Sequence, residues 1–188
     1  MTDIVVVYHS GYGHTQRLAQ SVAAGAGAQL LAIDAEGNLP QGGWEQLAAA
    51  DAIVFGSPTY MGGPSWQFKK FADGSSKPWF GQAWKDKLFA GFTNSGSING
   101  DKSSTMFYFF TLAMQHGGVW VGNGMMPSNS KAAQRNDVNW IGTFAGAASQ
   151  TPVDASAAEM LPGDLETGRQ FGQRVAAAAE RWLRGKGG

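Results

Sequence analysis

Five short runs of apolar residues, separated by segments long enough to form helices, constrain the fold of this chain more than any other feature. The first run, IVVVY at residues 4–8, has no charged or strongly polar position, which is typical of a strand buried on both faces. Strands that alternate with helices predict a parallel sheet covered on both sides, the doubly wound α/β class. The predicted strands are residues 4–8, 30–34, 52–56, 88–93 and 119–122. The predicted helices are residues 15–26, 44–50, 65–72, 103–116 and 165–184, the last with Asp164 as its N-cap.

The composition limits the class of protein. With 188 residues, 43% of them hydrophobic, the chain can bury one sizeable core, so we expect a single domain over residues 1–188. A formal net charge of zero, from 14 basic and 14 acidic residues, argues against a nucleic-acid partner. No apolar run approaches the roughly 18 residues of a membrane span, and no signal peptide is visible before the first strand. The absence of cysteine excludes disulfides and thiol catalysis and fits a reducing, cytoplasmic setting.

Three loops are expected to meet at one edge of the sheet. In an open parallel sheet, ligands bind beyond the carboxyl ends of the strands, where the strand order reverses. Residues 10–15, 57–63 and 94–100 leave such ends, and each loop is rich in Ser, Thr, Gly or Asn. Residues 123–162 are too long for an ordinary connection, so we expect them to carry structure or function of their own near this site.

The first loop, SGYGHT, leads directly into a helix, so its free backbone N–H groups and the helix dipole favour an anion. Ser10 and Thr15 add hydroxyl donors, while no lysine or arginine occurs before Arg17. This combination predicts one phosphate monoester held by neutral donors rather than a polyphosphate with magnesium. The endings typical of a P-loop and the glycine spacing of dinucleotide folds are both missing. The alternative is a turn and helix cap without a ligand.

The other two loops carry groups that suit a flat ring. The second loop, GSPTYMGGPS, presents Tyr60 and Met61 beside backbone amides, as a partly apolar ring with polar edges requires. The third loop, NSGSING, offers Ser95, Ser97 and Asn99 to the edge of the same ring. Taken alone, the second loop is a tight turn and the third a flexible connection. Three such loops at one predicted edge favour a ligand site.

The histidines and aromatic runs have competing interpretations. The three histidines are not clustered with acids at ligand spacing, so no metal site is expected. We expect His9 to pack beside the first strand and His14 to lie near the phosphate or on the surface. His116, just before the fifth strand, is expected at the ligand edge of the sheet. Residues 107–110, and the aromatic residues of 66–71, are predicted to be core. No serine lies in a Gly-x-Ser-x-Gly elbow, so a hydrolase triad is unsupported.

Four motifs carry a family resemblance. In order and spacing, SGYGHT, GSPTYMG, TNSGS and LAMQHGG resemble the flavodoxin-like family, most closely its WrbA-type NAD(P)H:quinone oxidoreductases, over residues 3–122. The resemblance implies a flavodoxin-like three-layer sandwich with a five-stranded parallel sheet in the order 2-1-3-4-5, and flavin mononucleotide (FMN) as cofactor. The cofactor-binding residues that it implies are Ser10, Gly11, Tyr12, Gly13, His14, Thr15, Pro58, Thr59, Tyr60, Met61, Gly62, Asn94, Ser95, Gly96, Ser97, Asn99 and His116.

The resemblance also implies a role for each part of this set. Residues 10–15 would hold the FMN phosphate, residues 59–61 would flank the isoalloxazine ring, and residues 95–99 would bond its pyrimidine edge. His116 is the expected catalytic residue, and either it or the backbone amides of residues 95–99 would donate to the reduced flavin. Trp79 and Tyr60 would form the rim that admits the substrate.

The implied function is two-electron transfer from NAD(P)H through FMN to a quinone or similar acceptor, which makes the protein an enzyme. Two alternatives are a flavodoxin-type one-electron carrier and an FMN-binding regulatory protein without turnover. Carriers of this sort are typically strongly acidic, so the zero net charge favours the enzyme. Tyr60 and Met61 stand where the family usually has arginine and phenylalanine, which puts recognition of the nicotinamide in question.

The resemblance further implies a homo-oligomer, a dimer or a tetramer. Several tryptophans outside any clear core periodicity agree, because aromatic residues are enriched at interfaces. They are Trp79, Trp84, Trp120 and Trp140.

Overall fold

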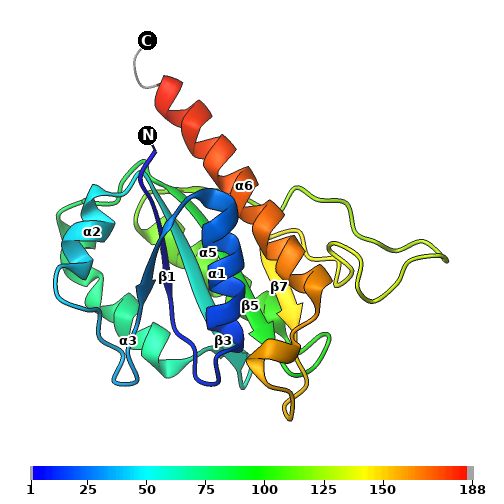
Figure 1. Ribbon diagram of the computed structural model, residues 1–188. Helices are drawn as coiled ribbons and strands as arrows, with labels where there is room; N and C mark the ends of the chain where they lie inside the picture. The colour runs from blue at the N-terminus through cyan, green and yellow to red at the C-terminus, as the bar shows by residue number, and fades with distance from the viewer. Residues whose placement is uncertain (1, 186–188) are drawn as a thin grey trace.

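A parallel sheet forms the middle layer of the computed structural model, which describes residues 2–185 (Figure 1). Its strands follow the order β2-β1-β3-β5-β6. They are β1 (Ile4–Tyr8), β2 (Gln29–Ala32), β3 (Ala52–Tyr60), β5 (Leu88–Ser95) and β6 (Val119–Trp120). Two further strands are β4 (Gly63–Pro64), antiparallel to β3, and β7 (Ala147–Gln150), parallel to β5. In chain order this is the predicted 2-1-3-4-5 sheet, so the predicted fold class is confirmed.

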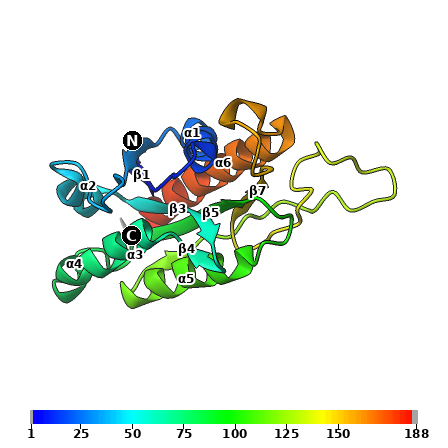
Figure 2. The same ribbon diagram turned by 90° about the horizontal axis from the view of Figure 1, so that it is seen from below.

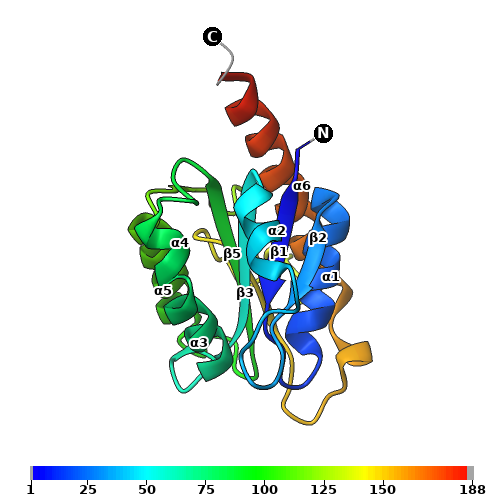
Figure 3. The same cartoon turned by 90° about the vertical axis from the view of Figure 1, so that its left-hand side faces the viewer.

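Helices cover both faces of this sheet (Figures 2 and 3). Those on one face are α1 (His14–Ala26) and α6 (Pro162–Gly185). Those on the other are α2 (Gly43–Ala49), α3 (Trp66–Gly74), α4 (Ser76–Phe80) and α5 (Lys102–Gln115). A 3₁₀ turn, η1 (Ala157–Glu159), precedes α6. None of the helices within residues 2–185 is both long and apolar enough to cross a membrane.

The two faces of β1 divide the core into two clusters. All five of its residues are buried, as the unbroken apolar run predicts. Val6 packs with α1 and α6, whereas Val5 and Val7 pack with α2, α3 and α5. Where α1 crosses α6, a Cβ added to Gly172 would lie 2.0 Å from the carbonyl oxygen of Val22, so the two backbones can approach this closely only because the residue is glycine.

The fifth strand of the sheet is formed in two pieces. β6 pairs with the first two residues of β5, and β7 pairs with its last four, Phe92–Ser95. The chain leaves the sheet between these pieces and forms the long excursion at the right of Figure 1. The predicted strand at 119–122 is therefore only the first half of the real one, and the predicted irregular segment 123–162 contains the second half.

Several predicted boundaries are wrong in ways that bear on the site. β3 continues four residues past the predicted end, to Tyr60, so Pro58 and Thr59 belong to a strand and not to a loop. α6 begins at Pro162, because proline is well suited to the first turn of a helix. Asp164 thus lies inside the helix and is not its N-cap. Its buried carboxylate instead pairs with Arg135 of the excursion, at 2.8 Å.

The aromatic runs are only partly core. Phe109, Phe68 and Phe71 are fully buried, as predicted. Phe107 is 68% exposed and Trp66 is 60% exposed, which corrects the prediction that both runs are core throughout. Consecutive residues of a helix point in different directions, so an unbroken aromatic run cannot be buried along its whole length against one sheet.

Candidate functional site

A cavity of about 760 Å³ lies where the carboxyl ends of β1, β3 and β5 meet, at the bottom of Figure 1. This volume is within the range of small-molecule and cofactor sites. All three predicted loops contribute to it, and no Asp, Glu, Lys or Arg lines it. The lining residues are Ser10, Tyr12, His14, Thr15, Pro58, Thr59, Tyr60, Met61, Gly62, Asn94, Ser95, Gly96, Ser97, Gly100, Thr151 and Val153.

The first loop is arranged as an anion cradle. The Ser10 hydroxyl oxygen accepts the N–H groups of Gly13 and Gln16, each at 3.1 Å, which shapes the loop and leaves the hydroxyl hydrogen free to donate. The backbone N–H groups of residues 11, 12, 14 and 15 have no acceptor in the described chain, and neither does the Thr15 hydroxyl. These donors surround the N-terminus of α1, whose dipole adds a positive potential. A phosphate would be held here by hydroxyl and backbone N–H donors, without lysine or arginine.

The second wall is a tight hairpin. β3 turns into β4 through Met61 and Gly62, whose φ angles of 48° and 77° fit a two-residue turn with both residues left-handed. This turn leaves Met61 fully exposed and Tyr60 39% exposed at the cavity mouth. The Tyr60 ring meets Tyr12 edge to face at 6.3 Å between centroids, and burial raises the pKa of its hydroxyl.

Gly11 is required by this hairpin. A Cβ at Gly11 would lie 2.7 Å from the Tyr60 hydroxyl oxygen, closer than real Cβ contacts. At Gly11 the first loop therefore contacts the Tyr60 side chain of the hairpin directly.

Thr59 contributes to the site mainly through hydrogen bonds within the protein. Its buried hydroxyl is 2.8 Å from the hydroxyls of both Thr93 and Thr105, and Thr93 in turn donates to the Ser57 carbonyl at 2.7 Å. This chain of hydroxyls ties β3 to β5 and α5 directly below the cavity. The Thr59 hydroxyl already has two partners, so its expected role beside the ring falls to the neighbouring backbone and to Tyr60.

The third loop presents donors. The side-chain oxygen Oδ1 of Asn94 accepts hydrogen bonds from the hydroxyls of Ser149 and Thr151, at 2.7 and 3.0 Å. This orients the side-chain amide so that its NH₂ group has no protein partner. The backbone N–H groups of residues 96–99 likewise find no acceptor in the described chain. Asn94 and Gly96 line the cavity, so this wall suits the acceptor-rich edge of a heteroaromatic ring.

A fourth wall comes from the segment 123–162, which was expected near the site, although its strand and its lining residues were not predicted. Thr151 and Val153, which follow β7, line the cavity, and the His14 ring nitrogen Nε2 lies 2.8 Å from the Ala155 carbonyl. The sequence AASQ of β7 lacks the β-branched and aromatic residues that identify strands, so this element was missed. One signal was available: a four-residue fifth strand is too short to pair with all of its neighbour, which predicts a second piece later in the chain.

His116 lies away from this cavity, which corrects its expected place at the ligand edge. It follows α5 and precedes β6, and β6 pairs with the start of β5, at Leu88. The cavity lies at the other end of β5, at Ser95, roughly 23 Å away at about 3.3 Å per residue. A residue that leads into a parallel strand belongs to the amino edge of the sheet, so His116 cannot donate to a ring held by the three loops of the same chain.

The surroundings of His116 are those of a core residue. Its Nε2 is 2.9 Å from the Ser75 hydroxyl, its ring lies 4.3 Å from that of Trp84, and burial lowers its pKa to about 4. Trp79, the predicted rim residue, lines a small surface cavity with His116 and not the main one. His9 is buried beside β1, as predicted. Of the other predicted binding residues, Gly11, Gly13 and Asn99 lie in the two loops without lining the cavity. In the described residues, no cluster of His, Asp or Glu is arranged to hold a metal.

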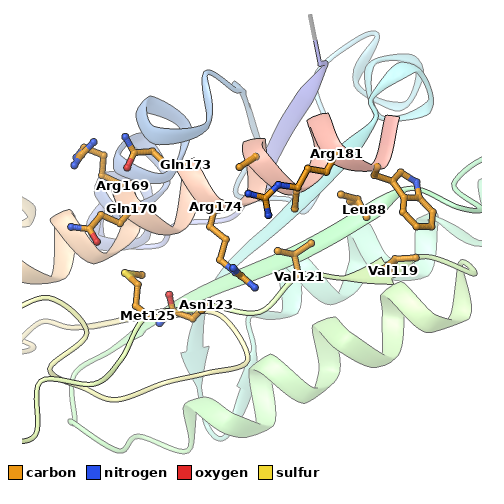
Figure 4. Close-up of a pocket in the computed structure, with 14 residues that line it drawn as sticks. Leu88, Val119, Val121, Asn123, Met125, Arg169, Gln170, Gln173, Arg174 and Arg181 are labelled. Carbon is orange, nitrogen blue, oxygen red and sulfur yellow. The ribbon is translucent and has the colours of Figure 1, made fainter. Parts of the chain in front are cut away.

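A second cavity, of about 720 Å³, lies between α6 and the edge strand β6 (Figure 4). Arg174 and Arg181 reach over its apolar floor of Leu88, Val119 and Val121. It is lined by the sides of elements and not by the ends of strands, so the rule that places ligands at the switch point favours the first cavity.

A doubly wound sheet with an uncharged, donor-lined cavity at its switch point defines an FMN-binding flavoprotein of flavodoxin-like fold. Residues 41–132 match the family described as NADPH-dependent FMN reductase. Flavodoxin FldP of Pseudomonas aeruginosa (strain UCBPP-PA14) is 51% identical over 181 residues, covering 96% of this chain and 98% of that protein. The chain therefore belongs to the flavodoxin-like family of FMN proteins.

Two further relatives show the breadth of that family. A protein named NAD(P)H dehydrogenase (quinone) from Geotalea daltonii (strain DSM 22248 / JCM 15807 / FRC-32) is 30% identical over 202 residues, covering 94% of this chain and 96% of that one. The crystal structure of a flavodoxin, WrbA-like protein from Agrobacterium tumefaciens is 54% identical, with a TM-score of 0.81, and covers 96% of this chain and 99% of that one.

Proposed function

We propose that this protein is an FMN-dependent oxidoreductase that passes two electrons from NAD(P)H to a quinone or a similar small acceptor. The observation that carries this proposal is the one-sided aromatic lining of the cavity. Tyr12 and Tyr60 are its aromatic lining residues, and both belong to the same side. The opposite side, from residues 94–97 and 151–153, offers no aromatic ring. A flat ring bound here keeps one face open, as a nicotinamide that delivers hydride requires.

The residues of the protein bind the cofactor, orient it and shield one face of its ring. The Ser10 and Thr15 hydroxyls and the N–H groups of the first loop hold the phosphate, while Tyr60 with Met61 covers one face of the ring. The Asn94 amide and the N–H groups of Gly96 and Ser97 meet the pyrimidine edge, where negative charge develops on reduction. FMN, when bound, supplies the hydride chemistry itself. The acceptor then enters by the open face after the oxidised nicotinamide has left, which predicts ping-pong kinetics.

A one-electron carrier is the second candidate. It is favoured by the 51% identical relative named flavodoxin FldP. Against it stands the zero net charge of the chain, because carriers of this fold dock to basic partners through a strongly acidic surface.

Anaerobic mixing of the FMN-loaded protein with NADH and with NADPH separates the two candidates. Followed by the flavin absorbance, an oxidoreductase bleaches within seconds and recovers when benzoquinone is added. A carrier is reduced by dithionite but by neither nicotinamide, and that result would refute the oxidoreductase. Because Tyr60 stands where related enzymes have arginine, we expect a high apparent KM for both nicotinamides.

A further inference from the structure

Four consecutive backbone carbonyls of the third loop, those of residues 95–98, accept hydrogen bonds from the rest of the chain. These four carbonyls accept hydrogen bonds from Lys102 and from the end of β7, and that of Ser97 also accepts from the Ser95 hydroxyl at 3.0 Å. Their donors are Thr151 N–H to Ser95 at 3.1 Å, Gln150 Nε2 to Gly96 at 2.8 Å, Lys102 Nζ to Ser97 at 2.7 Å and Lys102 Nζ to Ile98 at 2.9 Å.

This arrangement dictates where the N–H groups point. In a planar trans peptide, the C=O of one residue and the N–H of the next are directed oppositely. Since the carbonyls of Gly96, Ser97 and Ile98 point to Gln150 and Lys102, the N–H groups of Ser97, Ile98 and Asn99 point the other way. Ser97 lines the cavity, Ile98 and Asn99 lie next to it in the loop, and Lys102 does not line the cavity. None of the three N–H groups has an acceptor in the described chain. The loop is thus held as a row of free donors.

Lys102 is an unusual residue for its position. It is the first residue of α5 and only 3% exposed, and lysine is almost never buried so completely without a partner carboxylate. Its ammonium bonds to neutral carbonyls, at the helix end where a positive charge is unfavourable. Burial lowers its pKa to about 8. Helix stability therefore does not explain this lysine.

We propose that Lys102 is a positioning residue that locks the third loop in its donor orientation and, through its charge, favours the reduced form of the bound flavin. The inference deepens the proposed function and rests on FMN occupying the cavity. Reduction adds negative charge at the pyrimidine edge of the ring, so the N–H row and a cation directly behind it bind the reduced cofactor more tightly than the oxidised one. Lys102 touches neither the ring nor a substrate; it acts through the loop.

Three variants separate the role of the Lys102 ammonium from the nonspecific effect of losing a positive charge. Lys102→Met removes the charge and both carbonyl bonds, and Lys102→Arg keeps them. Lys77→Met is the matched control, because Lys77 is exposed on α4, has no side-chain partner and carries the same charge. FMN affinity of the oxidised protein and the two-electron midpoint potential of the bound FMN are measured for each.

For Lys102→Met we expect the affinity for oxidised FMN to change less than about threefold and that for reduced FMN to fall at least tenfold, which lowers the midpoint potential by about 30 mV. Lys102→Arg should recover most of this loss, and Lys77→Met should match the wild type. If the ratio of the two affinities in Lys102→Met stays within about twofold of the wild type, FMN binding stands and the role of Lys102 is refuted.

A measurement on the FMN-free wild type covers the case in which Lys102→Met does not fold or FMN does not bind. The charges nearest Lys102 are Asp164 of α6 and Arg135 of the excursion, with Asp101 next to it in sequence. Because the Lys102 ammonium bonds directly to the carbonyls of this loop, the amide resonances of Ser97, Ile98 and Asn99 should shift with one midpoint that follows its deprotonation. Resonances that stay constant from pH 7 to 10 would contradict the proposed role of Lys102 in holding the loop. A wild type that shows the shift but binds no FMN would refute the cofactor site alone.

Discussion

Thr15 gives the cleanest test of the phosphate cradle at the scale of a single residue. Its hydroxyl has no partner in the described chain, so Thr15→Val removes a bond to the ligand and nothing from the protein. We expect FMN affinity to fall by about 1.5–3 kcal/mol, the usual worth of a charge-assisted bond, with unchanged unfolding of the FMN-free protein. Fluorescence quenching and thermal melting measure both. Wild-type affinity in this variant would show that Thr15 does not meet the phosphate.

Replacement of Ser10 should have a second effect, because its hydroxyl also accepts hydrogen bonds within the loop. Ser10→Ala removes the acceptor for the N–H groups of Gly13 and Gln16 as well as the donor to the phosphate. We expect a similar loss of FMN affinity, now accompanied by a lower free energy of unfolding without FMN. The same two titrations check it, with Thr15→Val as the matched comparison. An unfolding curve identical to the wild type would mean that the loop does not depend on Ser10 for its shape.

The burial of His116 predicts that the folded protein loses stability in acid. Its pKa is about 4 when folded and about 6.5 when unfolded, so between these values the unfolded chain binds more protons. Its contribution is complete above pH 6.5 and is lost as the pH falls through 4, about 2 kcal/mol between pH 7 and 4.5. Urea unfolding of the wild type should show this loss, and His116→Gln, which stays neutral, should lack it. Equal pH slopes in the two proteins would contradict the buried neutral imidazole.

At the scale of elements, the contact between the first loop and the β3–β4 hairpin makes a coupled prediction. A Cβ at Gly11 overlaps only the Tyr60 hydroxyl, while the nearest ring carbons lie at an acceptable 3.6 and 3.7 Å. We expect Gly11→Ala to weaken FMN binding by about 1–3 kcal/mol through this overlap, and Tyr60→Phe in the same chain to restore most of it. FMN titrations of the single and double variants measure the coupling. If the two effects simply add, the hairpin and the loop do not share this contact.

How far the sequence predicted the structure also depends on the element. β1 is as predicted, because a strand buried on both faces is an unbroken run of apolar residues. β7 and the ion pair of Arg135 with Asp164 were missed, because their partners are brought together only by the completed sheet. His116 was assigned to the wrong edge, since a motif alone does not give the end of the strand at which a residue lies.

At the scale of the whole molecule, the exposed face of α5 favours association. Phe107, Phe110 and Met114 lie on one side of this helix and are 68%, 38% and 39% exposed, although the helix is already packed on its other side. By contrast, Trp84 is fully buried and Trp140 packs under Arg135. The tryptophans therefore support association less strongly than the sequence indicated.

We expect a dimer or tetramer at micromolar concentration, and a monomer when Phe107 and Phe110 are both replaced by glutamate. Light scattering measures the mass of each. Met126→Glu is the control, because Met126 is equally apolar and 84% exposed but lies on the excursion. A monomeric wild type would refute the prediction.

The central claim is that the cavity holds FMN by its phosphate, using hydroxyl and backbone N–H donors without lysine or arginine. Calorimetric titration of the cofactor-free protein with FMN and with riboflavin, which has the same ring and no phosphate, tests it most directly. The donors of the first loop make several charge-assisted bonds to the phosphate, so we expect riboflavin to bind at least about 100-fold more weakly than FMN. Comparable affinity for the two flavins would show that the first loop does not bind the phosphate, and it would contradict the FMN site described above.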